Sequence, residues 1–423
     1  MGRRPDRRRA ADRRGPLTEP AGLEGLIYDW NRDGRVARAD YRSVELDDET
    51  LRDGLQGPSV RNPPLAVKIR LLHLMDELGI DSADIGLPGA SGQARESIVA
   101  LAKETTKLRL TPNVAVRTHA ADINGAIQVA IESGVAIEVC AFIGSSQIRR
   151  VAESWSIDTM VKNVEESVTL VVKNGLPVMF VTEDTTRADP LTLIALYEAA
   201  IGCGATRICA SDTVGHATPE GVRNLLTFIR TDVIRGRDVK LDYHGHNDRG
   251  LGTINALAAT AIADRVHGTA LGIGERVGNA SMDQLLVNLR LWGLIDRNLE
   301  PLVEYAALVA EHCGAPIPAN YPALGEDAFR TGTGVHASAV VKALRRGDRD
   351  LADRVYSGVP ASIVGREQRI EVGPMSGESN VVYWLEHRGI EATRERVNRV
   401  IAAAKASDRL LTDEELNALA RLD

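Results

Sequence analysis

The segment Val239-Lys240-Leu241-Asp242-Tyr243-His244-Gly245-His246-Asn247-Asp248 joins a predicted strand to two histidines at its end. Residues i and i+2 of a strand point to the same face, so the imidazoles of His244 and His246 can reach one cation. Polar side chains at the C-terminal end of a strand, followed by a turn, are typical of a barrel enzyme's site. The segment alone leaves two interpretations open, a metal site and a pair of packing histidines.

Short β-prone runs alternate with longer amphipathic segments on both sides of this strand. Eight strands are predicted, at 43–47, 82–86, 113–117, 136–142, 177–182, 206–210, 239–244 and 266–271. Helices are predicted after them, at 64–78, 92–106, 123–133, 157–174, 190–202, 219–230, 250–264 and 281–291. Eight βα units over roughly 250 residues match a (β/α)8 TIM barrel. A doubly wound sheet also fits the alternation, but the unusual polar residues follow many different strands, which favours the barrel.

The barrel is predicted to span 43–298, and the sequence on either side has a different character. Residues 1–22 hold a dense arginine run and few apolar side chains, so we expect a disordered basic tail, followed by an N-terminal extension at 23–42. Residues 299–423 are predicted to form small helical subdomains, with helices at 302–313, 335–346, 381–387 and 393–404. Thr412 and Glu415 predict a capping box at the start of a last helix.

The composition predicts a globular, cytoplasmic protein. The 423 residues include 44% hydrophobic and 26% charged side chains and carry a net charge of −7, which argues against general nucleic-acid binding. The sequence holds no apolar run long enough to span a membrane. Four cysteines, Cys140, Cys203, Cys209 and Cys313, lack CxxC spacing and are expected to be small buried residues in a reducing compartment.

Further motifs follow four other predicted strands. They are Leu51-Arg52-Asp53-Gly54-Leu55-Gln56, Glu183-Asp184-Thr185-Thr186-Arg187, Asp212-Thr213-Val214-Gly215 and Gly274-Glu275-Arg276-Val277-Gly278-Asn279. The first motif alone also fits an ordinary solvated loop, and the glycine pattern of the last is weak evidence by itself. Together with His244–Asp248 and Gly332-Thr333-Gly334-Val335-His336-Ala337, and in this order, they resemble the 2-isopropylmalate synthase and homocitrate synthase family of metal-dependent TIM-barrel Claisen-type synthases and lyases. The resemblance covers most of the chain, from about Val44.

The resemblance implies a metal site and a set of catalytic and substrate-binding residues. Asp53, His244, His246 and Asn279 match the positions that hold a divalent metal, and such a mixed nitrogen and oxygen shell suits Mg²⁺, Mn²⁺, Co²⁺ or Zn²⁺. The implied catalytic residues are Arg52, Glu183, His336 and, in a loosely matching segment, Tyr356. The implied substrate contacts are Gln56, Asp84 (where relatives usually carry glutamate), His119 and Thr213.

The resemblance further implies an acyltransferase of amino-acid biosynthesis that condenses acetyl-CoA with a 2-oxo acid and then hydrolyses the thioester. It implies a homodimer with small-molecule partners and no leucine-feedback domain. The oxo acid stays open, because Arg117 with Asp122 resembles isopropylmalate synthases, whereas His119 falls where homocitrate synthases bind a distal carboxylate. A lyase similar to hydroxymethylglutaryl-CoA lyase is the alternative, since it shares Asp-Gly-Leu-Gln. Those lyases carry a cysteine in the loop after strand eight, which this sequence lacks.

Overall fold

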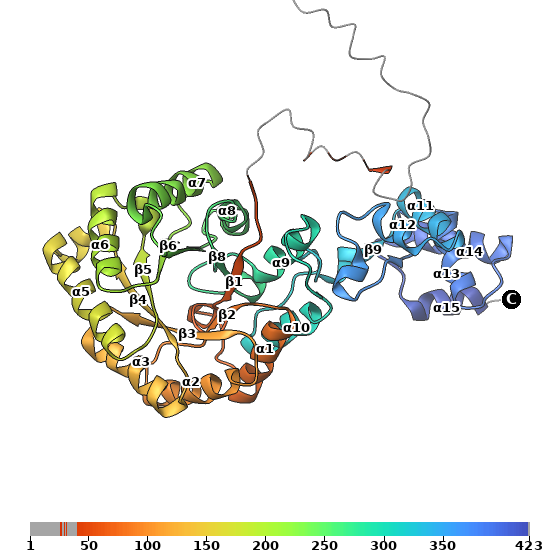
Figure 1. Ribbon diagram of the computed structural model, residues 1–423. Helices are drawn as coiled ribbons and strands as arrows, with labels where there is room; N and C mark the ends of the chain where they lie inside the picture. The colour runs from red at the N-terminus through yellow and green to blue at the C-terminus, as the bar shows by residue number, and fades with distance from the viewer. Residues whose placement is uncertain (1–25, 28, 30, 32–39, 422–423) are drawn as a thin grey trace, which may run out of the picture. The chain divides into compact units, whose positions relative to one another are not determined.

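Eight parallel strands form a closed barrel in chain order in the computed structural model (Figure 1). They are β1 Glu45–Asp48, β2 Ser82–Asp84, β3 Thr111–Arg117, β4 Glu138–Gly144, β5 Val178–Glu183, β6 Arg207–Asp212, β7 Lys240–Gly245 and β8 Arg265–Gly268. Each strand pairs with the next, and β8 pairs with β1 to close the barrel. The predicted (β/α)8 barrel is confirmed. The structure describes residues 26, 27, 29, 31 and 40–421, so the predicted tail at 1–22 and most of the extension at 23–42 lie outside the described residues.

Helices cover the outside of the strands (Figure 1). They are α1 Leu65–Glu77, α2 Gly92–Thr105, α3 Ala120–Ser133, α4 Gln147–Glu153, α5 Ile157–Lys173, α6 Pro190–Gly202, α7 Pro219–Phe228, α8 Gly252–Ala259 and α9 Met282–Leu291. Side-chain oxygens at the N-caps fix several starts, as at Ser156, Asp189 and Thr218, because each accepts a hydrogen bond from a first-turn N–H. The short α4 was not predicted, and α8 ends five residues before the predicted end.

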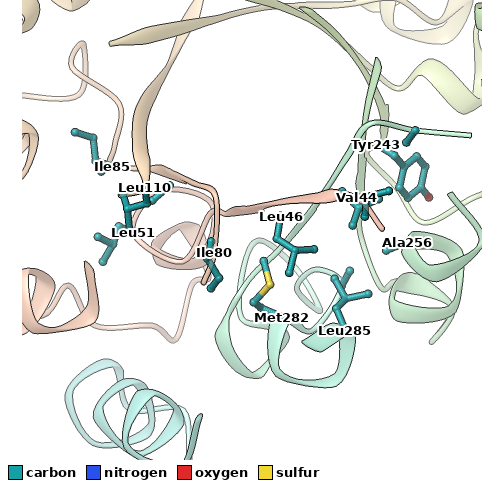
Figure 2. Packing of buried hydrophobic residues seen from close by; sticks show 14 of the residues in the cluster. Val44, Leu46, Leu51, Ile80, Ile85, Leu110, Tyr243, Ala256, Met282 and Leu285 are labelled. Atoms are coloured by element: carbon teal, nitrogen blue, oxygen red, sulfur yellow. The ribbon is translucent and has the colours of Figure 1, made fainter. Parts of the chain in front are cut away.

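The alternation of side chains along each strand separates the hydrophobic core from the site. In β7, Leu241 and Tyr243 belong to the buried apolar cluster between strands and helices, whereas Asp242 contacts Arg207 of β6 and His244 contacts His267 of β8. Figure 2 shows Leu46 of β1 pointing toward α9, which contributes Met282 and Leu285 to the same cluster. Burying each such leucine stabilises the fold by about 1.5–3 kcal/mol.

Charged side chains inside the barrel pair with one another across strands. Arg265 of β8 donates hydrogen bonds to Ser82 of β2 at 2.9 Å, to Glu138 of β4 at 2.7 Å and to Asp242 of β7 at 2.6 Å. Side chains from four strands can meet in this way only across the interior. Arg207 of β6 also donates to Asp242, at 2.7 Å. Loss of one partner would leave a buried charge uncompensated, so this network constrains the inward residues of β7 and β8.

The predicted helices after the barrel are present, with further short elements between them. The segment contains α10 Leu302–Cys313, β9 Arg330–Thr331, α11 Gly334–Arg345, α12 Arg349–Arg354, β10 Arg369–Ile370, α13 Glu378–His387, α14 Arg394–Ala406 and α15 Asp413–Arg421. The capping box is confirmed, because Thr412 N donates to Glu415 Oε2 at 2.8 Å and Glu415 N donates to Thr412 Oγ1 at 3.3 Å. The proposed boundary at 298/299 lies between α9 and α10. Among the described helices, none has the length and apolar content needed to cross a bilayer.

Candidate active site

A cavity of about 470 Å³ lies among the inward side chains and the loops that follow the strands. Its volume is in the range of small-molecule sites. All eight strands or their following loops contribute to the lining, which consists of Glu49, Arg52, Asp53, Gln56, Asp84, Leu87, Ala115, Cys140, Phe142, Met179, Val181, Glu183, Cys209, Ser211, Thr213, His244, His246, His267 and Glu275. The i, i+2 series along β5 and β6 shows that the pleat of the strands directs these residues inward. The cavity therefore sits where TIM-barrel enzymes bind substrate.

Asp53, His244 and His246 form a group that could hold a metal ion. One potential ligand atom from each lies within 4.8 Å of the others, and all three residues are buried. The rings of His244 and His246 are 5.0 Å apart, as expected for neighbours on one face of a strand. Burial and the nearby His244 lower the pKa of His246 to about 4, so its imidazole is neutral at pH 7 and has a lone pair for a cation.

Two buried polar atoms, one in this group and one beside it, are suited to bind a cation. Within the described part of the chain, Nδ1 of His246 and Oδ1 of Asn279 have no hydrogen-bond partner. Asn279 is fixed by its amide nitrogen, which donates to Oδ1 of Asp53 at 2.8 Å. A Cβ atom on Gly274 would lie 2.2 Å from that nitrogen, so only glycine lets the loop after β8 close here, at φ +152°. Unsatisfied buried donors and acceptors are costly, and a bound metal would relieve this cost.

A second group, Glu49, His244 and His267, also brings potential ligand atoms together. Nδ1 of His267 lies 2.6 Å from Glu49 and its Nε2 lies 3.0 Å from Asp242. Burial alone would lower the pKa of His267, but Asp47, Asp242 and Glu49 raise it to about 10. His267 is therefore an imidazolium that donates from both nitrogens and offers no lone pair. The group with Asp53 and His246 is the better metal site.

Arg52 lies beside the metal group and binds three carboxylates. Its Nε donates to Asp84 at 2.7 Å, its Nη1 to Asp53 at 2.7 Å and its Nη2 to Glu49. Burial opposes ionisation of Asp53, but the charges of Arg52 and the histidines lower its pKa. Burial has the larger effect on Asp84 and raises its pKa to about 7, although Arg52 opposes the shift. The guanidinium is thus held rigidly with its charge next to the cavity.

Three other predicted residues also line the cavity. Gln56 is exposed at its rim, and Glu183 is the last residue of β5. Burial raises the pKa of Glu183, and Arg149 and Arg52 oppose this shift. Oγ1 of Thr213 accepts a hydrogen bond from the backbone N–H of Asp184 at 2.8 Å, which leaves its own proton free for an anion.

The remaining predicted residues lie elsewhere. His119 is exposed, and its Nδ1 accepts the N-cap hydrogen bond of α3 from Ala121 N at 3.3 Å. Arg117 pairs with Asp122 outside the cavity lining. His336 of α11 stacks on Tyr356 with ring centroids 4.1 Å apart, and both are exposed. The structure therefore joins His336 to Tyr356 but does not bring either into the cavity of the same chain.

The sequence motifs did not single out Glu49 and His267, which lie at the centre of the site. Glu49 follows β1 in the charged run Asp47-Asp48-Glu49, and His267 is two residues after Arg265 on β8. The register pairs Asp47 with His267, which places the two side chains together at the closure of the barrel. Period-two alternation on β8 could have indicated that His267 points inward with Arg265.

Comparison with known proteins gives one family and several relatives. The HMGL-like family matches residues 43–309. A protein of Methanopyrus kandleri named as a probable 2-isopropylmalate synthase is 33% identical over 86% of this chain and 69% of its own length. A homocitrate synthase of the same organism is 32% identical over 91% of this chain and 95% of its own length. An (R)-citramalate synthase of Methanocaldococcus jannaschii is 30% identical over 89% and 74%.

Solved structures share the fold. The crystal structure of the HMG-CoA lyase of Bacillus subtilis superposes with a TM-score of 0.56 at 21% identity, and the match covers 66% of this chain and 97% of the lyase. At this identity the similarity shows the barrel fold alone. The sequence relatives, which extend past the barrel, carry the functional information.

Proposed function

Because the chain belongs to the HMGL-like family, and within it to the 2-isopropylmalate, homocitrate and citramalate synthases, we propose a specific form of their reaction for it. The enzyme condenses the acetyl group of acetyl-CoA with a 2-oxo acid, and hydrolysis of the thioester releases CoA. The 2-oxo acid carries one carboxylate and a small apolar side chain. The reaction requires a divalent cation (Mg²⁺, Mn²⁺, Co²⁺ or Zn²⁺) bound by Asp53, His244 and His246, with Asn279 beside them.

The charges around the cavity support an oxo acid with a single carboxylate. The cavity is lined by five acidic residues, Glu49, Asp53, Asp84, Glu183 and Glu275. Among the described lining residues Arg52 is the only arginine or lysine, and three of these carboxylates already bind it. The imidazolium of His267 also lines the cavity, but both of its N–H groups already donate to Glu49 and Asp242. A second substrate carboxylate would therefore be buried without a free partner cation, which costs at least about 1–3 kcal/mol. Because His119 and Arg117 lie outside the lining, neither offers that charge.

The apolar part of the lining supports a small aliphatic side chain. Cys140, Met179 and Cys209 form a separate buried cluster against which Val181 packs, and all four line the cavity. Burial raises the pKa of Cys140 and Cys209 well above the ordinary value, so both are neutral thiols. A methyl, ethyl or isopropyl group would lose water contact here without leaving a polar atom unsatisfied.

A panel of oxo acids tests the proposal. With metal-replete protein and acetyl-CoA, release of free CoA should be fastest with pyruvate, 2-oxobutyrate or 2-oxoisovalerate. We expect kcat/KM for 2-oxoglutarate and oxaloacetate to be lower by about 100-fold or more, because their second carboxylate finds no partner. A dicarboxylic oxo acid as the best substrate would contradict the assigned side chain. Absence of CoA release with every oxo acid would contradict the synthase, and cleavage of 3-hydroxy-3-methylglutaryl-CoA would instead support a lyase.

The side chains of the site suit the two halves of the condensation. The cation supplies Lewis-acid polarisation of the keto group when it is bound. Arg52, held by its three carboxylates, stabilises the negative charge that develops on the oxygen of the ketone or the enolate. The free hydroxyl proton of Thr213 binds the substrate carboxylate, and Gln56 contacts the substrate at the rim. Glu183 removes the proton from the acetyl methyl group as part of a base network.

The pH dependence tests the role of Glu183. A base works only when it is ionised, and burial raises the pKa of Glu183 above its ordinary value of 4.5. The kcat/KM of the wild type should therefore fall as the pH decreases through this raised pKa, on the acid side of the profile. In Glu183→Gln, kcat should fall about 10²- to 10⁴-fold and the acid limb of the residual activity should disappear. A profile from pH 5 to 9 measures both, and Glu166→Gln on the surface of α5 is the control, because Glu166 pairs only with Lys162 among the described residues. Retention of the acid limb in Glu183→Gln would exclude Glu183 as this base.

The exposed pair of His336 and Tyr356 supports a homodimer in which each subunit completes the other's base network. The two rings stack on each other and neither lines the cavity of its own chain. Light scattering should give a mass of twice 45.7 kDa for the protein in solution. A monomeric mass with full activity would contradict this arrangement.

A further inference from the structure

The carboxylate of Glu49 lies between two groups to which the proposed reaction assigns roles. Its Oε1 atom is 3.1 Å from Nδ1 of His244 and 2.6 Å from Nδ1 of His267. Its Oε2 atom accepts a hydrogen bond from Nη2 of Arg52. The Glu49 side chain is only 4% exposed, so these three donors replace the water that would otherwise solvate its charge. Both oxygens are occupied, which fixes the orientation of the carboxylate.

The contact with His244 determines which nitrogen of that ring carries the proton. An ionised carboxylate can only accept hydrogen bonds, so Nδ1 of His244 must donate to Glu49. When the ring binds a metal, its lone pair is then on Nε2. Nε2 is the nitrogen that remains for a cation shared with Asp53 and His246. A carboxylate in this position also makes the imidazole more basic and fixes its rotation.

Glu49 is itself held in place by the charged network of the barrel interior. His267 contacts Glu49 through Nδ1 and Asp242 through Nε2, at 2.6 and 3.0 Å. Asp242 in turn accepts a hydrogen bond from Arg265 at 2.6 Å. This chain of contacts joins β1, β7 and β8, the strands whose ends carry the predicted metal ligands. Because both nitrogens of His267 face carboxylates, Glu49, His244 and His267 do not form a second cation site.

We propose that Glu49 is a positioning residue that fixes the tautomer and orientation of His244 for metal binding and holds Arg52 beside the metal. This inference rests on the proposed function in one respect, since it requires a divalent cation at Asp53, His244 and His246. In this role Glu49 acts through His244 and Arg52 and does not contact the substrate. Its effect should therefore appear in metal affinity, measured without turnover.

Metal titration of the variant Glu49→Gln tests the proposal. Metal-free wild type and variant are titrated with Mn²⁺ by calorimetry, and the visible spectrum is recorded with Co²⁺. We expect Glu49→Gln to bind Mn²⁺ about 10- to 100-fold more weakly, the usual effect of losing an outer-shell partner of a histidine ligand. The Co²⁺ spectrum should change because the orientation of His244 is no longer fixed. Circular dichroism and a cooperative unfolding transition check that the variant is folded.

The matched control is Glu138→Gln. Glu138 belongs to the same buried network, through Arg265 and Arg207, but it contacts no residue of the metal group and does not line the cavity. Its Mn²⁺ affinity should stay within about twofold of the wild type, as expected for a distant site. An equal loss of affinity in both variants would overturn the proposal, because the network would then act only through general stability. Wild-type affinity in Glu49→Gln would also overturn it.

A second variant covers the case in which Glu49→Gln does not fold. Glu49→Asp keeps the charge but is one methylene shorter, so it cannot reach His244 and His267 together. We expect weaker Mn²⁺ binding in this variant too, and unchanged affinity in folded Glu49→Asp would overturn the proposal. The two proposals can fail separately. Wild-type protein that binds neither Mn²⁺ nor Co²⁺ would overturn both, whereas CoA release by the wild type with unchanged metal affinity in the variants would overturn only the role of Glu49.

Discussion

His246→Ala is expected to lose tight metal binding and almost all CoA release while it retains the fold. His246 supplies one of three ligand candidates, its imidazole is neutral at pH 7, and its Nδ1 has no partner among the described residues. Removing a direct ligand should weaken metal binding by more than the roughly 100-fold limit seen for outer-shell partners. Because the remaining site cannot hold the cation at ordinary concentrations, kcat should fall by about 10³-fold or more.

Metal content after dialysis, Mn²⁺ calorimetry and CoA release measure this effect. His73→Ala is the control, because His73 lies on α1, contacts Glu104 at 2.8 Å and does not line the cavity. His73→Ala should keep both metal and activity. If His246→Ala binds Mn²⁺ like the wild type, the ligand assignment is wrong. Loss of activity with full metal occupancy would indicate that His246 contacts the substrate instead of the metal.

Arg52→Lys is expected to lower kcat by about 10²- to 10³-fold, which corresponds to about 2.7–4 kcal/mol. Lysine keeps one positive charge, but its ammonium cannot bind Glu49, Asp53 and Asp84 in the planar arrangement of a guanidinium. The charge would no longer have a fixed position toward the oxygen that becomes negative. The three carboxylates would also repel one another more strongly, so the free energy of unfolding should decrease.

Steady-state kinetics with saturating Mn²⁺ separates the two consequences. A loss in kcat with little change in KM for the oxo acid indicates a role in the transition state. Arg109→Lys is the control, since Arg109 pairs with Asp76 away from the cavity and its replacement should leave kcat unchanged. A kcat for Arg52→Lys within about tenfold of the wild type would be too small for a charge next to the reacting oxygen.

Local patterns in the sequence predicted most of the fold. Alternation along strands such as Val239–His244 and three- and four-residue spacing in segments such as Ile157–Asn174 reflect backbone geometry that each segment has by itself. The capping residues Ser156, Asp189 and Thr218 act within one turn of their helices, so the helix starts agree closely with the predictions. The short α4 was missed because seven residues give too little periodicity.

The candidate site, like the fold, could be predicted from the sequence only in part. Asp53, His244, His246 and Asn279 could be named because the short motifs that contain them resemble the metal-binding motifs of the family. That Asp53, His244 and His246 line one cavity, with Asn279 bonded to Asp53 beside it, follows from barrel closure. His119 could not be placed in this way, because its imidazole caps α3 instead of turning into the cavity, a choice of side-chain rotamer that sequence spacing does not report.

The sequence by itself determined the barrel, the family and the identity of the motif residues, because these depend on local periodicity and on short segments. Only the tertiary structure decided that Glu49 meets His267, 218 positions away, and that both join His244. That contact depends on the register between β1 and β8, the last pairing to close the barrel. The tertiary structure also decided that carboxylates outnumber basic side chains around the cavity. Residues from all parts of the barrel contribute to this local charge only because the ends of the strands converge.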